Sequence, residues 1–545
     1  MATLLCLLTL SMLAVRPFIG PVGGCTACRQ CYGTAQSHAI PLGIVRYRAV
    51  LLTDVASPEW TKMQLSEYVN YDGVGLADLV ARGQVTAAEL AATAQLASEA
   101  VNPQINAVVE TWPAQDTPAP GSTPLAGVPF LIKDLAVAMA GKRVELGSRL
   151  AAGNVAGADS SLMARFRRAG LVTLGRTATP EFAYSTTTEG VLYGATRNPW
   201  DPTRSPGGSS GGSGAAVAAG IVPIAHATDA AGSIRVPAAG NGLFGLKPTR
   251  GRISMGPDAD EVFNGLAVHG VLSRSVRDSA ALLDLVHGPE TGDPYSAQRP
   301  ERPYAQEITR SPGSLRIGLL TQPWGGRTAD ATVVDATLRS ARLTESLGHR
   351  VEEVQVDLGV SWEEFVLANA RLWSTNLVTW IDGLAAAFER PVDSTTVEPE
   401  MLASYTYGQQ VSGAEFVRAL AMRNSVARAI GRYFTDYDLL LTPTLPELPV
   451  LLGTYAEGAD GADGLGWVRQ LFHRSPFTAA FNVAGTPAMS VPLETDPATG
   501  LPIGIQFAAG YGREDALFRL AGQLEQAAPW AQRTPAVWAG NHHNA

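Results

Sequence analysis

Short apolar runs and longer amphipathic stretches alternate along most of the chain. The short runs are continuous, as in strands buried on both faces, and occupy residues 128–132, 171–174, 315–320 and 438–442. The longer stretches have helical periodicity and occupy residues 160–169, 329–347, 362–384 and 414–434. This alternation predicts an α/β fold with a mixed or parallel sheet.

Local patterns add elements at both ends of this region. Thr86 and Glu89 have the spacing of a capping box, so they predict the start of an alanine-rich helix. Pro103 is expected to end that helix shortly after residue 101. Toward the C-terminus we expect late strands at residues 481–492 and 502–508 and a closing helix at residues 514–526.

The most unusual stretch is rich in glycine and serine. Residues 207–214 contain only these two amino acids, and a helix-forming run at 215–219 follows at once. A second small-residue turn lies at 230–233, after another apolar piece. Such a composition is typical of a flexible linker. The adjoining apolar elements favour a different interpretation, in which the backbone passes close to another group and a Cβ would be in the way.

Two kinds of chemistry that use glycine-rich loops do not fit this stretch. A phosphate-binding loop needs a lysine to reach the phosphates, and residues 207–246 contain none. The spacing Gly208-x-Ser210-x-Gly212 matches a nucleophile elbow, but that elbow needs a strand directly before the serine. Residues 201–206 have the sequence of a turn, so we interpret the match as accidental.

The stretch resembles the signature of the amidase signature family, whose hydrolases use a Ser–Ser–Lys triad. Ser233 in the sequence AAGSIR matches the family's nucleophile, and Ser209 in GGSSGG matches the serine that bridges to the base. Lys133 in GVPFLIKD matches the base itself. The resemblance runs from about residue 68 to residue 535, and the chain looks most like the bacterial 6-aminohexanoate-cyclic-dimer hydrolases, the nylon-oligomer amidases.

The resemblance also assigns roles around the nucleophile. It implies an oxyanion hole made by backbone N–H groups at Ala230, Ala231 and Gly232, and by that of the nucleophile. Most members have glycine in place of Ala231, although the cyclic-dimer hydrolases share the alanine. Asp229 and Arg235 are expected to support the turn rather than to react.

Two residues, His226 and Lys133, are candidates for the base that accepts the proton of Ser233. A serine hydroxyl requires a proton acceptor, and His226 is the only histidine near Ser233. A single histidine in an apolar strand is more often a core residue, and we interpret His226 so. A lysine serves instead when burial keeps it uncharged, which Lys133 at the end of an apolar strand permits. Asp134 is expected to be structural, because an ion pair would raise the pKa of Lys133.

What the resemblance implies for the whole chain is one catalytic domain at residues 63–540. Its expected fold is a central mixed, mostly parallel sheet covered by helices on both faces, with a helical substrate cover at about residues 360–432. The expected reaction is cleavage of the C–N bond of a small-molecule amide, a linear or cyclic ω-amino-acid amide, through an acyl-enzyme. Carbamate (urethane), aryl-amide or ester hydrolysis on the same triad stays open. Less favoured are an amidotransferase subunit and a binding module that has lost catalysis.

Composition and charge limit the kinds of partner and cofactor that we expect for this chain. The chain has 545 residues, a net charge of −9 and a pI near 5.5, with no basic run, so we expect no binding to nucleic acid or to a membrane. All four cysteines lie in the first 31 residues, which leaves the remaining sequence without a thiol nucleophile or a disulfide. Cys25, Cys28 and Cys31 have metal-ligand spacing, but His38 is the only histidine nearby. We expect no metal and no cofactor, and a homodimer stays open.

The first 62 residues are interpreted as an extension outside the fold. Family-like sequence begins just after Met63, and a chain starting there is expected to fold and to be active. An apolar run at residues 2–15 lacks the basic residues that precede the core of a secretory signal. We therefore expect a cytoplasmic protein, with export as the alternative.

Overall fold

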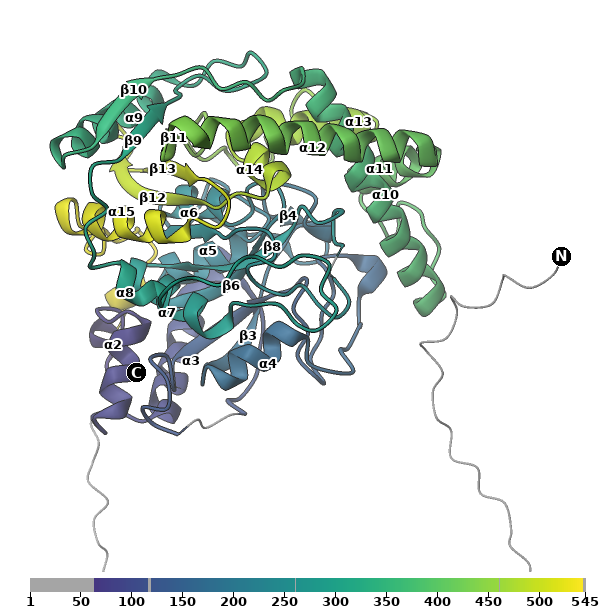
Figure 1. Cartoon of the computed structure of the whole chain (residues 1–545). Coiled ribbons are helices and arrows are strands. Elements are labelled where there is room, and N and C mark those ends of the chain that lie inside the picture. The colour runs from purple at the N-terminus through teal and green to yellow at the C-terminus, as the bar shows by residue number, and fades with distance from the viewer. Residues whose placement is uncertain (1–62, 116–118, 260, 460, 543–545) are drawn as a thin grey trace, which may run out of the picture. The chain divides into compact units, whose positions relative to one another are not determined.

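The computed structural model describes residues 63–115, 119–259, 261–459 and 461–542 (Figure 1). The predicted N-terminal extension and its cysteines lie outside these residues. Within the described part, one large mixed sheet runs through the molecule with helices packed against it. The fold class predicted from the sequence, α/β with a mixed sheet flanked by helices, is confirmed.

The main sheet has 11 strands in the order β1-β3-β2-β6-β8-β7-β12-β13-β11-β9-β10. Two further short strands, β4 and β5, pair with each other. The strands are β1 Val108–Thr111, β2 Pro129–Lys133, β3 Val172–Thr177, β4 Glu189–Gly190, β5 Gly194–Ala195, β6 Ile224–Asp229, β7 Phe244–Lys247, β8 Val268–Ser273, β9 Arg316–Leu319, β10 Arg350–Glu353, β11 Leu439–Pro443, β12 Ala488–Thr495 and β13 Pro502–Ala509.

The expectation of a mostly parallel sheet is wrong. Parallel pairing joins β3 to β2, β2 to β6, β11 to β9 and β9 to β10. The other six neighbouring pairs of the main sheet are antiparallel. One reason is local: the turn between β12 and β13 is too short for the crossover that parallel strands need.

The helices include two short elements at the N-terminal end and four long ones in the second half of the chain. They are α1 Leu65–Tyr68, α2 Gly73–Ala81, α3 Ala87–Ile105, α4 Ser161–Arg168, α5 Gly211–Ala218, α6 Arg235–Asn241, α7 Val276–Val286, α8 Tyr304–Glu307, α9 Ala331–Ser346, α10 Trp362–Phe388, α11 Pro399–Gln410, α12 Gly413–Asp436, α13 Gly464–Arg474, α14 Ala479–Ala484 and α15 Glu514–Ala527. No helix of the described ranges is long and apolar enough to cross a membrane.

Two helix boundaries show how local sequence acts. The capping box is present: Glu89 N–H donates to Thr86 Oγ1, and Thr86 N–H donates to Glu89. Helix α3 nevertheless continues past Pro103 and ends at Ile105. A proline in the last turn of a helix removes one backbone hydrogen bond, and this is tolerated because the helix ends shortly afterwards. The strand expected at residues 481–492 is partly wrong, since α14 occupies its first part and Gly485, with φ 78°, ends that helix before β12.

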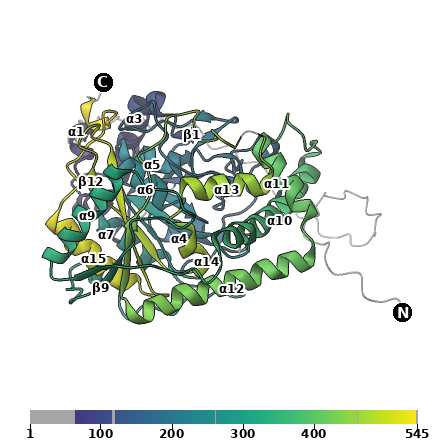
Figure 2. The ribbon, with the colours of Figure 1, turned by 90° about the horizontal axis from the view of Figure 1, so that it is seen from above.

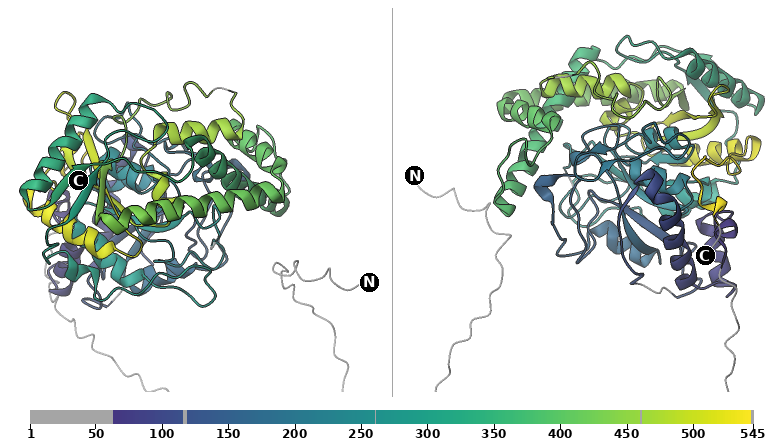
Figure 3. Two further views of the ribbon diagram at one scale, coloured as in Figure 1. Left: turned by 45° about the horizontal axis from the view of Figure 1, so that its top comes forward. Right: turned by 180° about the vertical axis from the view of Figure 1, so that it is seen from behind.

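Helices α10, α11, α12 and α13 pack against one another. Figure 2 shows them as a group beside the sheet, and Figure 3 shows the same group from two further sides. Their apolar side chains join those of the loops above the sheet in a hydrophobic cluster that is separate from the main core. This group contains the segment predicted to cover the substrate, and that role stays a prediction.

Candidate active site

Three parallel strands end at one edge of the sheet and place the predicted base. Strands β3, β2 and β6 are adjacent and parallel, so their carboxyl ends lie together. Lys133 is the last residue of β2. Its Nζ lies 2.7 Å from Ser209 Oγ and 2.9 Å from Thr228 Oγ1. The structure thus brings two of the three predicted triad residues into hydrogen-bond contact, although 76 positions separate them.

Burial determines the charge of this lysine. Lys133 is fully buried, and desolvation lowers its pKa from 10.5 to about 7, against the opposing charge of Asp229. An amine with that pKa is substantially uncharged near neutral pH. It can then accept a proton from Ser209 while it donates one of its own to Thr228.

The glycine- and serine-rich stretch is closely packed, which excludes the flexible linker. The Gly208–Ser209 peptide bond is cis, and all of α5 is buried. A Cβ built on Gly208 would lie 2.3 Å from the carbonyl oxygen of Thr187, and one on Gly212 would lie 2.4 Å from the nitrogen of Ala178. Only glycine therefore fits where this turn meets the segment after β3.

Ser210, the serine of the rejected nucleophile-elbow pattern, is hydrogen-bonded to the backbone of strand β6. Its Oγ accepts the N–H of Thr228 at 3.2 Å and donates to the Thr228 carbonyl at 3.3 Å. Ser213, one turn further along α5, donates to the carbonyl of His226 at 2.7 Å. These hydroxyls bind the helix to strand β6 and leave Ser209 as the serine that faces Lys133.

The predicted nucleophile lies in the turn directly after β6. Ser233 is 6% exposed, and Gly232 before it has φ 138°, a conformation that favours glycine. Asp229 forms a fully buried ion pair with Arg235 at 2.9 Å and accepts the N–H of Ile234 at 3.2 Å. The pair lowers the pKa of Asp229 to about 2, despite its burial. Both residues hold the turn, in agreement with the structural role expected for them.

One predicted oxyanion-hole donor already has an acceptor within the protein. The N–H of Gly232 donates to Asp229 Oδ1 at 2.7 Å, so an oxyanion would have to displace a buried carboxylate to use it. The carbonyl of Ala231 accepts a short hydrogen bond from Thr478, which fixes the peptide beside it. The role predicted for the N–H groups of Ala230, Ala231, Gly232 and Ser233 stays a hypothesis, in which Gly232 would have to exchange its present acceptor.

Asp134, next to the base in sequence, is bound elsewhere. It accepts the N–H groups of Glu145 and Gly147 and forms an ion pair with Arg176 at 2.7 Å. Arg176 also binds Glu145 and Glu110, so its charge is shared among three carboxylates. The expectation that Asp134 is structural agrees with these contacts.

Sequence reasoning missed Thr228 as the second partner of Lys133. It lies two residues after His226 and therefore on the same face of β6, directly before Asp229. The alternation of side chains along this strand was the sequence signal that could have identified Thr228. His226 is a buried core residue, as interpreted from the sequence, and it contacts the Lys133 backbone and His269.

An aromatic group connects the site region with the helical segment. Trp373 of α10 stacks on Phe263 at 4.6 Å and meets Tyr184 edge-on at 5.3 Å. Tyr184 also lines a cavity of about 160 Å³, and so does Thr187, the residue that packs on Gly208. The cavity wall combines aromatic rings with four carboxylates: Tyr184, Tyr455, Trp467, Glu181, Glu189, Glu398 and Glu400.

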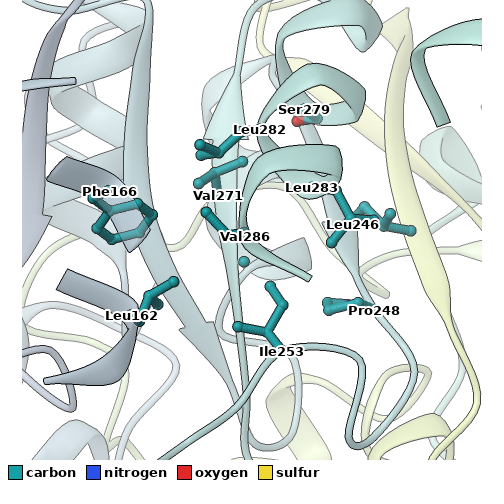
Figure 4. A pocket seen from close by; sticks show the side chains of 11 residues that line it. Leu162, Phe166, Leu246, Pro248, Ile253, Val271, Ser279, Leu282, Leu283 and Val286 are labelled. Atoms are coloured by element: carbon teal, nitrogen blue, oxygen red, sulfur yellow. The ribbon is translucent and has the colours of Figure 1, made fainter. Parts of the chain in front are cut away.

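A second, apolar cavity has no part in the chemistry. Figure 4 shows it between α4, the strands β7 and β8, and α7. Its volume is about 20 Å³. Ser279 is its only polar side chain, and no titratable group lines it.

In the described part of the chain, no group of three or more His, Cys, Asp or Glu side chains is arranged to hold a metal ion.

Comparison with known proteins places this geometry in a family. The sequence profile described as Amidase matches residues 82–518. The chain therefore belongs to the amidase signature family, and it is a hydrolase that acts on amide C–N bonds.

Particular relatives agree with this assignment. The 6-aminohexanoate-cyclic-dimer hydrolase of Paenarthrobacter ureafaciens is 40% identical over 480 residues, which cover 85% of this chain and 96% of that protein. The solved structure of a 6-aminohexanoate cyclic dimer hydrolase with its substrate is similar with a TM-score of 0.79 and 38% identity, covering 86% of this chain and 99% of the other. A bacterial aryl acylamidase is similar with a TM-score of 0.75 and 26% identity, covering 85% and 97%.

Proposed function

We propose that this hydrolase cleaves small linear or cyclic ω-amino-acid amides through an acyl-enzyme, with Ser233 as nucleophile, Ser209 as bridge and Lys133 as base. The observation that carries the proposal is the 2.7 Å contact between Lys133 Nζ and Ser209 Oγ. Burial with a pKa of about 7 suits that lysine to accept a proton near neutral pH.

The reaction follows from this arrangement. Ser233 Oγ attacks the amide carbonyl and passes its proton to Ser209, which gives its own proton to Lys133. The N–H groups of Ala230, Ala231 and Ser233 stabilise the oxyanion of the tetrahedral intermediate. When the C–N bond breaks, the proton returns from Lys133 through Ser209 to the leaving amine. Water then attacks the ester of Ser233 by the same relay and releases the acid.

Similarity supports the substrate class. The proteins that match over nearly their full length include 6-aminohexanoate-cyclic-dimer hydrolases at 40% identity. A cyclic dimer of an ω-amino acid is a small neutral amide. Carbamates, aryl amides and esters present a carbonyl to the same three residues, and the similarity to an aryl acylamidase favours aryl amides among them.

The test is a substrate panel on the purified full chain. Cyclic and linear 6-aminohexanoate dimers, an anilide, a carbamate and an ester are incubated separately, and mass spectrometry identifies the products. We expect the dimers to give free 6-aminohexanoate or its linear dimer at the highest kcat/KM, with none formed by the Ser233→Ala variant. Turnover of the carbamate or anilide alone would overturn the substrate assignment. Undiminished turnover by the variant would overturn the assignment of the nucleophile.

A further inference from the structure

A histidine side chain takes the place of a backbone acceptor beneath the base. The ladder between β2 and β6 pairs Phe130 with Ile224 and Leu131 with Ala225. If that register continued, a carbonyl of β6 would accept the N–H of Lys133. The N–H instead donates to His226 Nδ1 at 3.3 Å. The freed carbonyl of His226 accepts the hydroxyl of Ser213 from α5 at 2.7 Å.

These contacts define the protonation of two histidines. Because His226 Nδ1 accepts a hydrogen bond, the proton of the neutral ring is on Nε2. That atom lies 3.0 Å from His269 Nδ1 on β8, which must then be the acceptor. A proton added to either ring would break one link of this chain, since each Nδ1 is already used as an acceptor.

The surroundings keep both rings neutral. His226 is 0% and His269 is 1% exposed, and desolvation lowers the pKa of each, that of His269 to about 3. The ring of Phe166 from α4 packs against His226 at 5.8 Å. The titratable group nearest to the two rings is Lys133, whose own neighbour Asp229 is bound by Arg235. The hydroxyls from α5 are uncharged.

We propose that the neutral His226–His269 pair positions Lys133 for catalysis: by accepting the Lys133 N–H it holds the main chain at the end of β2 and so keeps the amine at Ser209 and Thr228. This inference rests on the proposed function, in which Lys133 is the base. His226 acts through Lys133 and does not touch the reacting atoms. It is therefore a positioning residue for the reaction.

Two substitutions of His226 test this positioning role. His226→Ala removes the ring and leaves a space lined by the Lys133 N–H, the His226 carbonyl and the Ser213 hydroxyl, which suits a water molecule. Hydration would raise the pKa of Lys133 toward its ordinary value of 10.5. His226→Asn keeps an acceptor, Oδ1, at the position of Nδ1 and should retain much of the positioning. Ile224→Ala, on the same face of β6 and equally buried, is the matched control for a lost core side chain.

The experiment measures labelling of the purified full chain by diisopropyl fluorophosphate as a function of pH. Ser233 Oγ forms a bond to phosphorus, the P–F bond breaks, fluoride leaves, and the serine proton goes through Ser209 to Lys133. The rate therefore reports the charge of Lys133 without any amide substrate. We expect the midpoint of the acid limb to rise by about one pH unit or more in His226→Ala, and to stay within about 0.3 unit in His226→Asn and Ile224→Ala.

The outcomes distinguish this inference from the proposed function. If the parent chain is not labelled at Ser233, the proposed function fails. If the parent is labelled but His226→Ala has an unchanged acid limb, or shifts no more than Ile224→Ala, the positioning role is refuted. Should His226→Ala not fold, His226→Gln is measured in its place. Its longer side chain cannot keep an acceptor at the δ position, so an acid limb identical to the parent's would equally refute the role.

Discussion

Replacement of Lys133 by methionine tests the base through stability rather than through turnover. A lysine whose pKa is lowered on folding binds fewer protons in the folded than in the unfolded chain. The resulting destabilisation is complete below the folded pKa, decreases as pH rises from about 7 to 10.5, and is absent above that range. Lys133→Met removes the titrating group and should therefore increase stability at low pH most.

The pKa values give the size of the effect. A change from 10.5 to about 7 corresponds to about 5 kcal/mol of folding free energy at low pH. Methionine also loses the hydrogen bonds to Ser209 and Thr228, at about 1 kcal/mol each. That loss is the same at every pH, so it cancels when two pH values are compared. The gain from Lys133→Met should be about 2 to 3 kcal/mol larger near pH 6 than near pH 9.

The assay is urea unfolding of parent and variant at the two pH values, followed by tryptophan fluorescence. Lys142→Met, at a half-exposed lysine over the ring of Trp112, is the control and should change stability equally at both. The kcat/KM profile of the parent should rise with pH through an apparent pKa of about 7 and then level off, as the free base requires. An equal gain at the two pH values, together with a flat rate profile, would show that Lys133 is not an uncharged base.

Three further results are expected. Ser233→Ala should lower kcat by about 10⁶-fold, whereas Ser209→Ala should lower it by about 10² to 10⁴-fold because water can relay the proton; equal losses in a cyclic-dimer assay would contradict the bridging role. Asp229→Asn should cost about 3–5 kcal/mol in urea unfolding, because Arg235 is left buried and unpaired, and a loss below about 1 kcal/mol would refute the supporting role. EDTA should leave activity unchanged, and inactivation reversed by zinc would contradict the metal-free mechanism.

Much of the site was predictable because its residues are fixed by strand ends and tight turns. An apolar run followed by Lys133 indicated the end of a buried strand, and small residues at two turns indicated close backbone contact. These features, with the family resemblance, placed Lys133 and Ser209 together. The sequence has no comparable signal for the partner of a single N–H, so the engagement of Gly232 by Asp229 was missed.

The sheet was predicted less well for a different physical reason. A strand buried on both faces has the same apolar pattern whether its neighbours are parallel or antiparallel. The antiparallel pairs around β7, β12 and β13 therefore carried no distinguishing sequence pattern. Helix α14 was taken for a strand because its short run of buried residues shows no clear period.

The packing of the glycine turn has a consequence for how such chains diverge. At Gly208 and Gly212 a methyl group would overlap backbone atoms of the segment after β3, which cannot move aside without the strand. At Gly157 and Gly383, by contrast, a Cβ would meet no atom within 4 Å, and neither residue has a positive φ. Substitutions can therefore accumulate at the latter positions over long times while the turn stays the same. The exclusion of a Cβ at these two glycines is thus enough to preserve the motif in distant sequences. This holds even for a descendant that has changed its substrate.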